Sequence, residues 1–157
     1  MENVIVQSIF AFISTIGFGV VFNIKGRNLF FASIAGGLSW FVYKFCLLFD
    51  PSTSFAMFIS AVCFSTYSEI LARKLKTPVT TLVICALIPL VPGSGMYYTM
   101  HEAVTGDTLK ALDLAIDTLS SAGSLALGTL FVSTITRHYY SKKHKKLLKK
   151  ENVSNTK

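Results

Sequence analysis

The stretch PLVPGSGMY, residues 89–97, decides how this chain folds because it interrupts a long apolar segment. It brings together two prolines and two glycines, and neither residue type supports a regular α-helix in the middle of a span. In a lipid environment an unpaired backbone group is costly, so a broken helix survives only inside protein or beside a water-filled cavity. Interrupted spans of this kind point to the binding sites of transporters. The sequence therefore indicates a transport protein whose cargo site lies near this break.

The composition is that of a membrane protein. Hydrophobic residues make up 52% of the 157-residue chain, and its mean hydropathy is +0.54. Only 15% of the residues are charged, against about 25% in soluble domains. This apolar content is too high for the core of one soluble domain of this length. The net charge of +7 gathers in two short connections and after Arg137, which indicates a membrane-topology signal and no nucleic-acid partner.

Hydropathy divides the chain into five apolar segments of membrane-spanning length. Each is close to the roughly 20 residues that cross about 30 Å of hydrocarbon. The segments cover residues 4–22, 29–49, 55–71, 79–100 and 112–135. We therefore predict an all-α polytopic membrane helix bundle of about five transmembrane helices, with the fourth helix interrupted at Pro92–Gly95. The five-span transmembrane domain would occupy residues 1–136, and residues 137–157 would form a basic cytoplasmic tail.

The distribution of lysine and arginine predicts how the chain is oriented in the lipid bilayer. Cations gather after the first, third and fifth segments, at Lys25, Arg27, Arg73, Lys74, Lys76 and the tail. The opposite side carries Glu2, Asp50, Glu102 and Asp107, with Lys110 as its one loop cation. The positive-inside rule then places the N-terminus outside and the C-terminus in the cytoplasm.

The break itself supports two interpretations. In the first, a substrate pathway is lined by Pro89, Pro92, Gly93, Ser94, Gly95 and Tyr97. The glycines would let a ligand approach the backbone, and a helix that restarts near Met96 would offer a partially positive N-terminus to a carboxylate. In the second, the motif is a plain kink that ends the fourth helix at the outer interface, and its tyrosines belong to the aromatic belt.

A second polar group lies in the fifth segment. Asp113 and Asp117 are spaced i, i+4 and so share one helical face, and Ser120, Ser121 and Ser124 continue the polar region. Acidic side chains inside a membrane are costly and mark ion or proton pathways. Both aspartates are therefore candidates for ion coupling. Asp113 also has a simpler interpretation as a residue that caps the helix in the outer headgroup region.

Two further patterns have structural interpretations. Glu69 and Arg73, also spaced i, i+4, are predicted to form a surface ion pair at the inner end of the third segment. Small residues recur one turn apart in the second and fifth segments, as in Ala32/Gly36 and Ser124/Gly128. Small residues let helix backbones approach closely in a membrane, so these positions predict helix packing.

The sequence contains no pattern typical of a metal site, a cofactor site or a catalytic centre. The three cysteines lie in different predicted spans, and no Cys/His spacing resembles a zinc or haem motif. No nucleophile–base pair is apparent, so we do not expect an enzyme. A non-transporting scaffold or assembly subunit is the alternative to a transporter, and it would tolerate changes in the glycine-rich break.

The motif LIPLVPGSGMY at residues 87–97, in a five-span chain with a basic end, resembles the bacterial threonine/serine exporter family. More narrowly, the chain is similar to that family's small split subunit, which corresponds to the C-terminal membrane half of the fused exporters. The resemblance implies export of small polar metabolites, such as threonine, serine or a dicarboxylate like succinate, across the bacterial cytoplasmic (inner) membrane. It also implies a larger membrane subunit of the same family as partner. An odd number of spans independently favours pairing with a unit of opposite orientation.

Overall fold

The described backbone is helical throughout its regular elements, which confirms the all-α prediction. The computed structural model describes the backbone of residues 2–49 and 52–155 and the side chains of residues 4–49 and 52–140. Asp50, one of the acidic residues used to predict orientation, lies outside the described residues, as do the side chains of the basic tail after Tyr140. The elements are α1 (Glu2–Val21), α2 (Arg27–Leu47), α3 (Thr53–Leu75), α4 (Val79–Leu87), the 3₁₀ turn η1 (Ile88–Leu90), α5 (Gly93–Thr105) and α6 (Thr108–Asn155).

Four of these helices are long and apolar enough to cross a membrane: α1, α2, α3 and the part of α6 from Thr108 to Tyr140. A fifth span is formed if the segments Val79–Leu90 and Gly93–Thr105 are counted as one, and they meet at an angle of 48°. The predicted interruption of the fourth helix is therefore confirmed, and the chain is a multi-pass membrane protein. The helix restarts at Gly93, three residues earlier than the sequence suggested.

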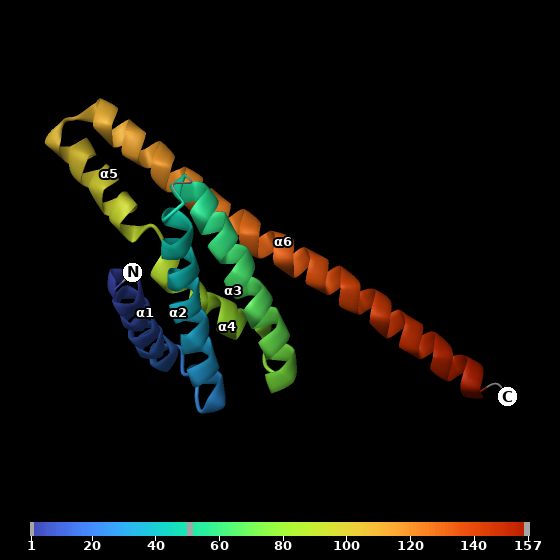
Figure 1. Ribbon diagram of the computed structural model, residues 1–157. Coiled ribbons are helices and arrows are strands. Elements are labelled where there is room, and N and C mark those ends of the chain that lie inside the picture. Colours follow the sequence, from blue (N-terminus) through green and yellow to red (C-terminus); the bar gives the residue numbers. More distant parts are fainter. Residues whose placement is uncertain (1, 50–51, 156–157) are drawn as a thin grey trace.

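Helix α6 is much longer than the predicted fifth segment. It begins at Thr108 and continues to Asn155, a length of 48 residues, which corresponds to about 72 Å at 1.5 Å per residue. The region from residue 137 to residue 155 thus continues the same helix without a break. Figure 1 shows α6 crossing obliquely behind the other helices and extending well beyond them.

The helices form a bundle, and α5 together with the first part of α6 projects from one end of it as the α5–α6 arm. Figure 1 shows α1, α2 and α3 alongside one another, with α4 behind them and α5 folded back along the first part of α6. Helix α2 packs against α1, α3 and α4, and α3 packs against α6. Helix α5 has α6 as its main neighbour, and none of its residues is buried. The break at Pro92 therefore lies where the bundle meets the α5–α6 arm.

Small residues allow the closest helix contacts, as the sequence predicted. A Cβ atom at Gly36 of α2 would collide with the side chain of Thr15 on α1. A Cβ atom at Gly128 of α6 would collide with Ala61 on α3 and lie 3.0 Å from the Phe58 carbonyl oxygen. Because lipid tails are as apolar as leucine, such close packing is a main source of helix association in a membrane.

Two buried serines form hydrogen bonds between the helices next to the break. The Ser39 hydroxyl of α2 donates to the Ala86 carbonyl of α4 at 2.9 Å, and the Ser60 hydroxyl of α3 donates to the Ser39 carbonyl at 2.6 Å. Leu90, in the 3₁₀ turn, is buried in an apolar cluster with Phe64 of α3 and other residues of α2, α3, α4 and α6. The N-terminal side of the break is thus held firmly against α2 and α3.

Candidate functional site

At the break, the 3₁₀ turn η1 ends at Leu90 and the α-helix α5 begins at Gly93. The Val91 N–H donates to the Ile88 carbonyl at 3.2 Å and closes the 3₁₀ turn. Pro92 then adopts φ −75° and ψ 58°, and the Gly93 N–H donates to the Val91 carbonyl at 2.7 Å. These angles are those of an inverse γ-turn centred on Pro92.

Helix α5 starts directly after this turn with two free backbone donors. Its first helical bond is from the Met96 N–H to the Pro92 carbonyl, at 3.2 Å. Pro92 occupies the N-cap position and supplies no side-chain cap. Within the described residues, the N–H groups of Ser94 and Gly95 therefore have no acceptor. Such groups give a helix N-terminus its affinity for anions.

A cavity of about 730 Å³ lies at this point, between α2, the start of α3, the break and α6. Its wall is rich in hydroxyl groups, and Asp117 is the one charged side chain among the described lining residues. The lining consists of Trp40, Tyr43, Ser52, Thr53, Ser54, Met57, Pro89, Leu90, Val91, Pro92, Gly93, Ser94, Gly95, Leu114, Asp117, Thr118 and Ser121. The volume falls within the roughly 300–1,000 Å³ range of small-molecule sites.

The structure brings most of the predicted break residues together with one of the two predicted aspartates. Five of the six predicted break residues and one of the two predicted aspartates line the cavity: Pro89, Pro92, Gly93, Ser94, Gly95 and Asp117. Asp117 follows the break by more than twenty residues in the chain, so only the reversal between α5 and α6 brings them together. A helix end with free N–H groups and a carboxylate therefore share one cavity.

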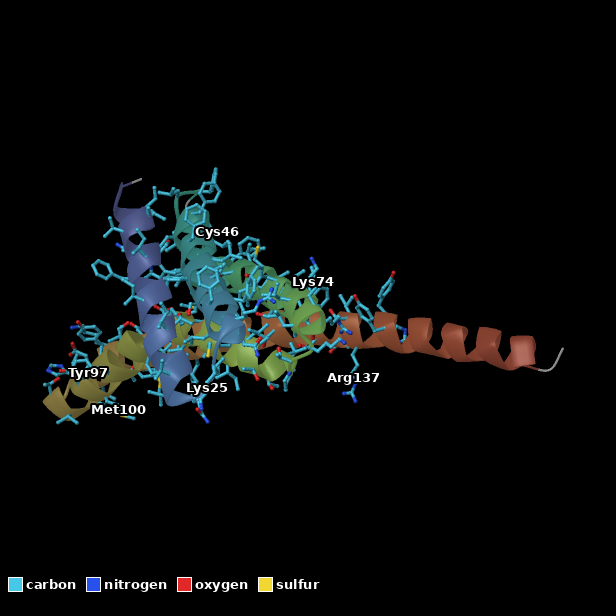
Figure 2. The ribbon with its side chains drawn as sticks, turned by 90° about the horizontal axis from the view of Figure 1, so that it is seen from below. Lys25, Cys46, Lys74, Tyr97, Met100 and Arg137 are labelled. Carbon is cyan, nitrogen blue, oxygen red and sulfur yellow. The ribbon has the colours of Figure 1, made fainter. Side chains whose placement is uncertain are left out.

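Two predicted residues lie outside the cavity lining. Tyr97 is 64% exposed, and its ring lies 5.4 Å from that of Tyr98 and 6.1 Å from that of His101, between centroids. Figure 2 shows Tyr97 on the α5–α6 arm, well away from Arg137 at the other end of the bundle. Asp113 lies one turn before Asp117 on α6, and both aspartates are exposed. Both residues are close in sequence to residues that line the cavity, but they do not line it themselves.

The two glycines of the break have different surroundings. A Cβ atom at Gly93 would meet nothing within 4 Å, whereas one at Gly95 would collide with the hydroxyl of Thr118 on α6. Neither glycine has a positive φ angle. Gly95 is therefore small because α5 packs on α6 there, and Gly93 is the glycine that borders open space. The sequence pattern alone predicts the same role for both glycines.

Two aromatic residues of α2 complete the cavity wall and were not predicted. The rings of Trp40 and Tyr43 lie 5.6 Å apart between centroids, and the Trp40 indole N–H donates to the Gln7 side chain of α1 at 3.3 Å. The Lys44 ammonium lies 5.5 Å from the centroid of the Trp40 ring. In the sequence, only the i, i+3 spacing of this tryptophan and tyrosine could have indicated a role in the cavity. The same spacing is common on any packed helix face.

The serines of α6 have separate roles in this region. The Ser120 hydroxyl lies 2.8 Å from that of Ser54, so a hydrogen bond joins α6 to the first turn of α3. Ser121 lines the cavity and is 6% exposed. The Thr118 hydroxyl donates to the Leu114 carbonyl of its own helix at 2.6 Å. The Ser54–Ser120 bond therefore links the turn of α6 that follows Asp117 to the start of α3.

The Glu69–Arg73 ion pair forms, but the prediction that it lies on the surface was wrong for the carboxylate. Arg73 Nη2 lies 3.0 Å from Glu69 Oε2. Glu69 is buried, with 7% of the residue exposed, while Arg73 is about one-third exposed at its side chain. The helix spacing predicted the pair, whereas the burial depends on α4 and α6, which cover this face of α3.

Comparison with known proteins gives one family. A family model described as "Threonine/Serine exporter, ThrE" matches residues 7–135, an interval that contains every residue of the cavity lining. A Corynebacterium glutamicum protein described as "Threonine/serine exporter" is 29% identical over 99 residues, which cover 63% of this chain and 20% of that protein. The chain thus spans about a fifth of the length of the curated relative it matches. No solved structure matches.

Proposed function

We propose that this chain, which belongs to the threonine/serine exporter family, is a membrane subunit of an exporter for small hydroxy amino acids such as threonine and serine. The observation that carries this proposal is the cavity at the helix break, where Asp117 faces the residues that begin α5. The role is one of binding and translocation, without covalent chemistry. The membrane is the bacterial cytoplasmic membrane.

The polar groups of the cavity match the two charges of an amino acid. The ligand carboxylate would accept hydrogen bonds from the free N–H groups of Ser94 and Gly95, where the helix end also carries partial positive charge. The ligand ammonium would pair with the Asp117 carboxylate. The hydroxyl groups along the wall, such as those of Ser54 and Ser121, suit the side-chain hydroxyl of threonine or serine.

The same groups disfavour a dicarboxylate such as succinate, the other cargo that the resemblance implied. A dicarboxylate brings two negative charges, and one helix N-terminus can neutralise only part of that charge. The second carboxylate would lie near Asp117, and no cationic side chain is found among the described lining residues. Like charges at close range repel each other. A zwitterion is therefore the better match.

Asp117 is also the better candidate for ion coupling. It borders a cavity in a helix that crosses the membrane, the setting in which acidic residues act in proton and cation pathways. Asp113 shares a helical face with Asp117 but lies one turn nearer the α5–α6 connection and outside the cavity lining, where capping or headgroup contact explains it. Coupling through Asp117 would link release of the ammonium group to uptake of a proton or cation.

A second subunit would complete the pathway. The matched region is about a fifth of the curated relative's length, so a full exporter of this family contains much more protein. Five spans with the N-terminus outside and the C-terminus inside leave room for an inverted unit across a shared midplane site. We infer that the partner is a larger membrane subunit of the same family, which closes the open side of the cavity. A scaffold role without transport is the alternative.

Co-expression tests the proposal directly. Cells that lack other exporters for these amino acids would be loaded with labelled threonine or labelled succinate, and efflux would be measured with this chain alone, with the larger subunit alone, and with both. We expect threonine efflux above background only with both subunits, and no gain for succinate. Succinate efflux without threonine efflux would contradict the assigned cargo. Full threonine efflux from proteoliposomes containing this chain alone would contradict the two-subunit arrangement.

A further inference from the structure

A second cavity, of about 580 Å³, lies between the last turns of α3, the first turns of α4 and the middle of α6. It shares no residue with the cavity at the helix break and lies at the opposite end of α4 from Pro92. Its described lining consists of Glu69, Arg73, Val79, Thr80, Val83, Ile84, Ser133, Arg137 and Tyr140. The consecutive helices α3 and α4 and the more distant α6 thus form its wall. The proposed transport pathway does not use this cavity.

One end of this cavity is cationic. Arg73 is held on one side by Glu69, at 3.0 Å, and on the other by Tyr140, whose ring centroid lies 3.4 Å from the guanidinium carbon. The bond to Glu69 uses only part of the five-donor guanidinium fork. Arg137 lies one turn before Tyr140 on α6, and no ion-pair partner for it is found among the side chains that the structure describes. With Glu69 neutralised by Arg73, this end has a net charge of about one positive unit.

The rest of the cavity wall is apolar. Val79, Val83 and Ile84 follow one face of α4, and Ile84 is 49% exposed. Thr80 and Ser133 are the two residues with aliphatic hydroxyl groups among the described lining residues. The cavity is therefore amphipathic, with two arginines at its rim and a hydrocarbon-like surface beside them.

We propose that this cavity binds one anionic phospholipid of the inner leaflet. Its phosphate would contact Arg73 and Arg137, and an acyl chain would lie along Val83 and Ile84. Basic pockets between transmembrane helices on the cytoplasmic side recognise such headgroups, and the positive-inside orientation puts these arginines on that side. The inference rests on that orientation and does not depend on the identity of the cargo.

An amino-acid cargo matches this cavity less well than a lipid does. The ammonium group of an amino acid would face two guanidinium groups, and the one carboxylate in the lining is already paired with Arg73. The apolar side of the wall would also stay without a partner. An anionic lipid satisfies both the charge at the rim and the hydrocarbon surface.

Native mass spectrometry of the full chain tests the proposal. The protein would be placed in nanodiscs of equal parts phosphatidylglycerol and phosphatidylcholine, released into detergent, and scored for retained lipid. We expect retained phosphatidylglycerol to exceed phosphatidylcholine in the unchanged protein. Arg137→Gln should lower that preference about fivefold, the factor equivalent to the roughly 1 kcal/mol that one basic residue contributes near an anionic surface. Ile84→Trp should lower total lipid retention by filling the apolar side of the cavity.

Lys74→Gln is the matched control, because it removes one positive charge at the same end of α3 from an exposed residue outside the lining. Figure 2 shows Lys74 and Arg137 at the same end of the bundle. Equal losses from Lys74→Gln and Arg137→Gln would overturn the proposal in favour of a general surface-charge effect. Displacement of the retained lipid by millimolar threonine would overturn it in favour of an amino-acid site. Circular dichroism of each variant confirms that the helices are intact before the lipid ratios are compared.

Discussion

At the scale of single residues, the break contains two glycines with different physical roles. Gly95 lies against Thr118, so its missing side chain allows α5 to contact α6. Gly93 has free space around it and lines the cavity. A side chain at Gly95 therefore affects helix packing, whereas one at Gly93 enters the volume proposed for the ligand. Mutations at these two positions separate folding from binding.

Gly93→Val is expected to reduce threonine export while leaving the amount of protein in the membrane near normal. Valine is apolar, so insertion is maintained, and its branched side chain would occupy the cavity beside Ser94. A loss of tenfold or more in efflux corresponds to about 1.4 kcal/mol of lost binding. Efflux and membrane abundance would be measured together in the co-expression system.

Gly95→Val serves as the contrast, because overpacking against Thr118 costs about 1–3 kcal/mol. It should lower membrane abundance along with efflux. Normal efflux from abundant Gly93→Val protein would show that the break is only a kink in the helix.

Asp117→Asn is expected to abolish most export, and Asp113→Asn to change it little. The two substitutions are identical in chemistry and lie one turn apart on α6, but only Asp117 lines the cavity. A charged hydrogen bond contributes about 2 kcal/mol, so threonine efflux should fall about thirtyfold. Initial rates at several internal threonine concentrations would be compared. Equal losses at both positions would argue for a general effect of charge on α6.

At the scale of elements, the decisive unit is the bent pair formed by α4–η1 and α5. Its two segments meet at 48°. The first segment is held by the Ser39 hydrogen bond and by the apolar cluster around Leu90, whereas the second contacts mainly α6. A pair bent in this way either crosses the membrane as one broken span or returns to the side it came from. The two arrangements place the connection at Asp107 on opposite sides.

Topology reporters distinguish these arrangements. If the bent pair crosses, a reporter inserted near Asp107 should be external, and a reporter fused after Lys157 should be cytoplasmic, as the distribution of Lys and Arg predicts. A re-entrant pair would instead place the Asp107 reporter in the cytoplasm and, after the single crossing of α6, the Lys157 reporter outside. Two reporters that are active on opposite sides of the membrane would be placed in turn near Asp107 and after Lys157. A third fusion, before α1, would report the side of the N-terminus in the same experiment.

At the scale of the whole molecule, the fold was largely predictable and the site only in part. Hydropathy, proline and glycine predicted the apolar segments of spanning length, the helical class and the position of the break, because these depend on local chain chemistry and lipid solvation. The bounds were less accurate, since α6 continues far past the apolar segment through residues that favour helix without being apolar. Of the predicted site residues, Tyr97 and Asp113 do not line the cavity.

The amino-acid sequence by itself determined that this chain is a membrane helix bundle with one interrupted apolar segment, a basic end and an acidic pair in the segment that follows. Only the tertiary structure decided that Asp117 lines the cavity at the break while Asp113 does not, that Gly95 packs on Thr118 while Gly93 borders a cavity, and that Glu69 is buried. The physical reason is that spans and breaks follow from each segment's interaction with lipid. The rotation and crossing of helices follow instead from contacts between segments, such as Gly128 on Ala61 and Ser39 on Ala86, and no local pattern specifies these contacts.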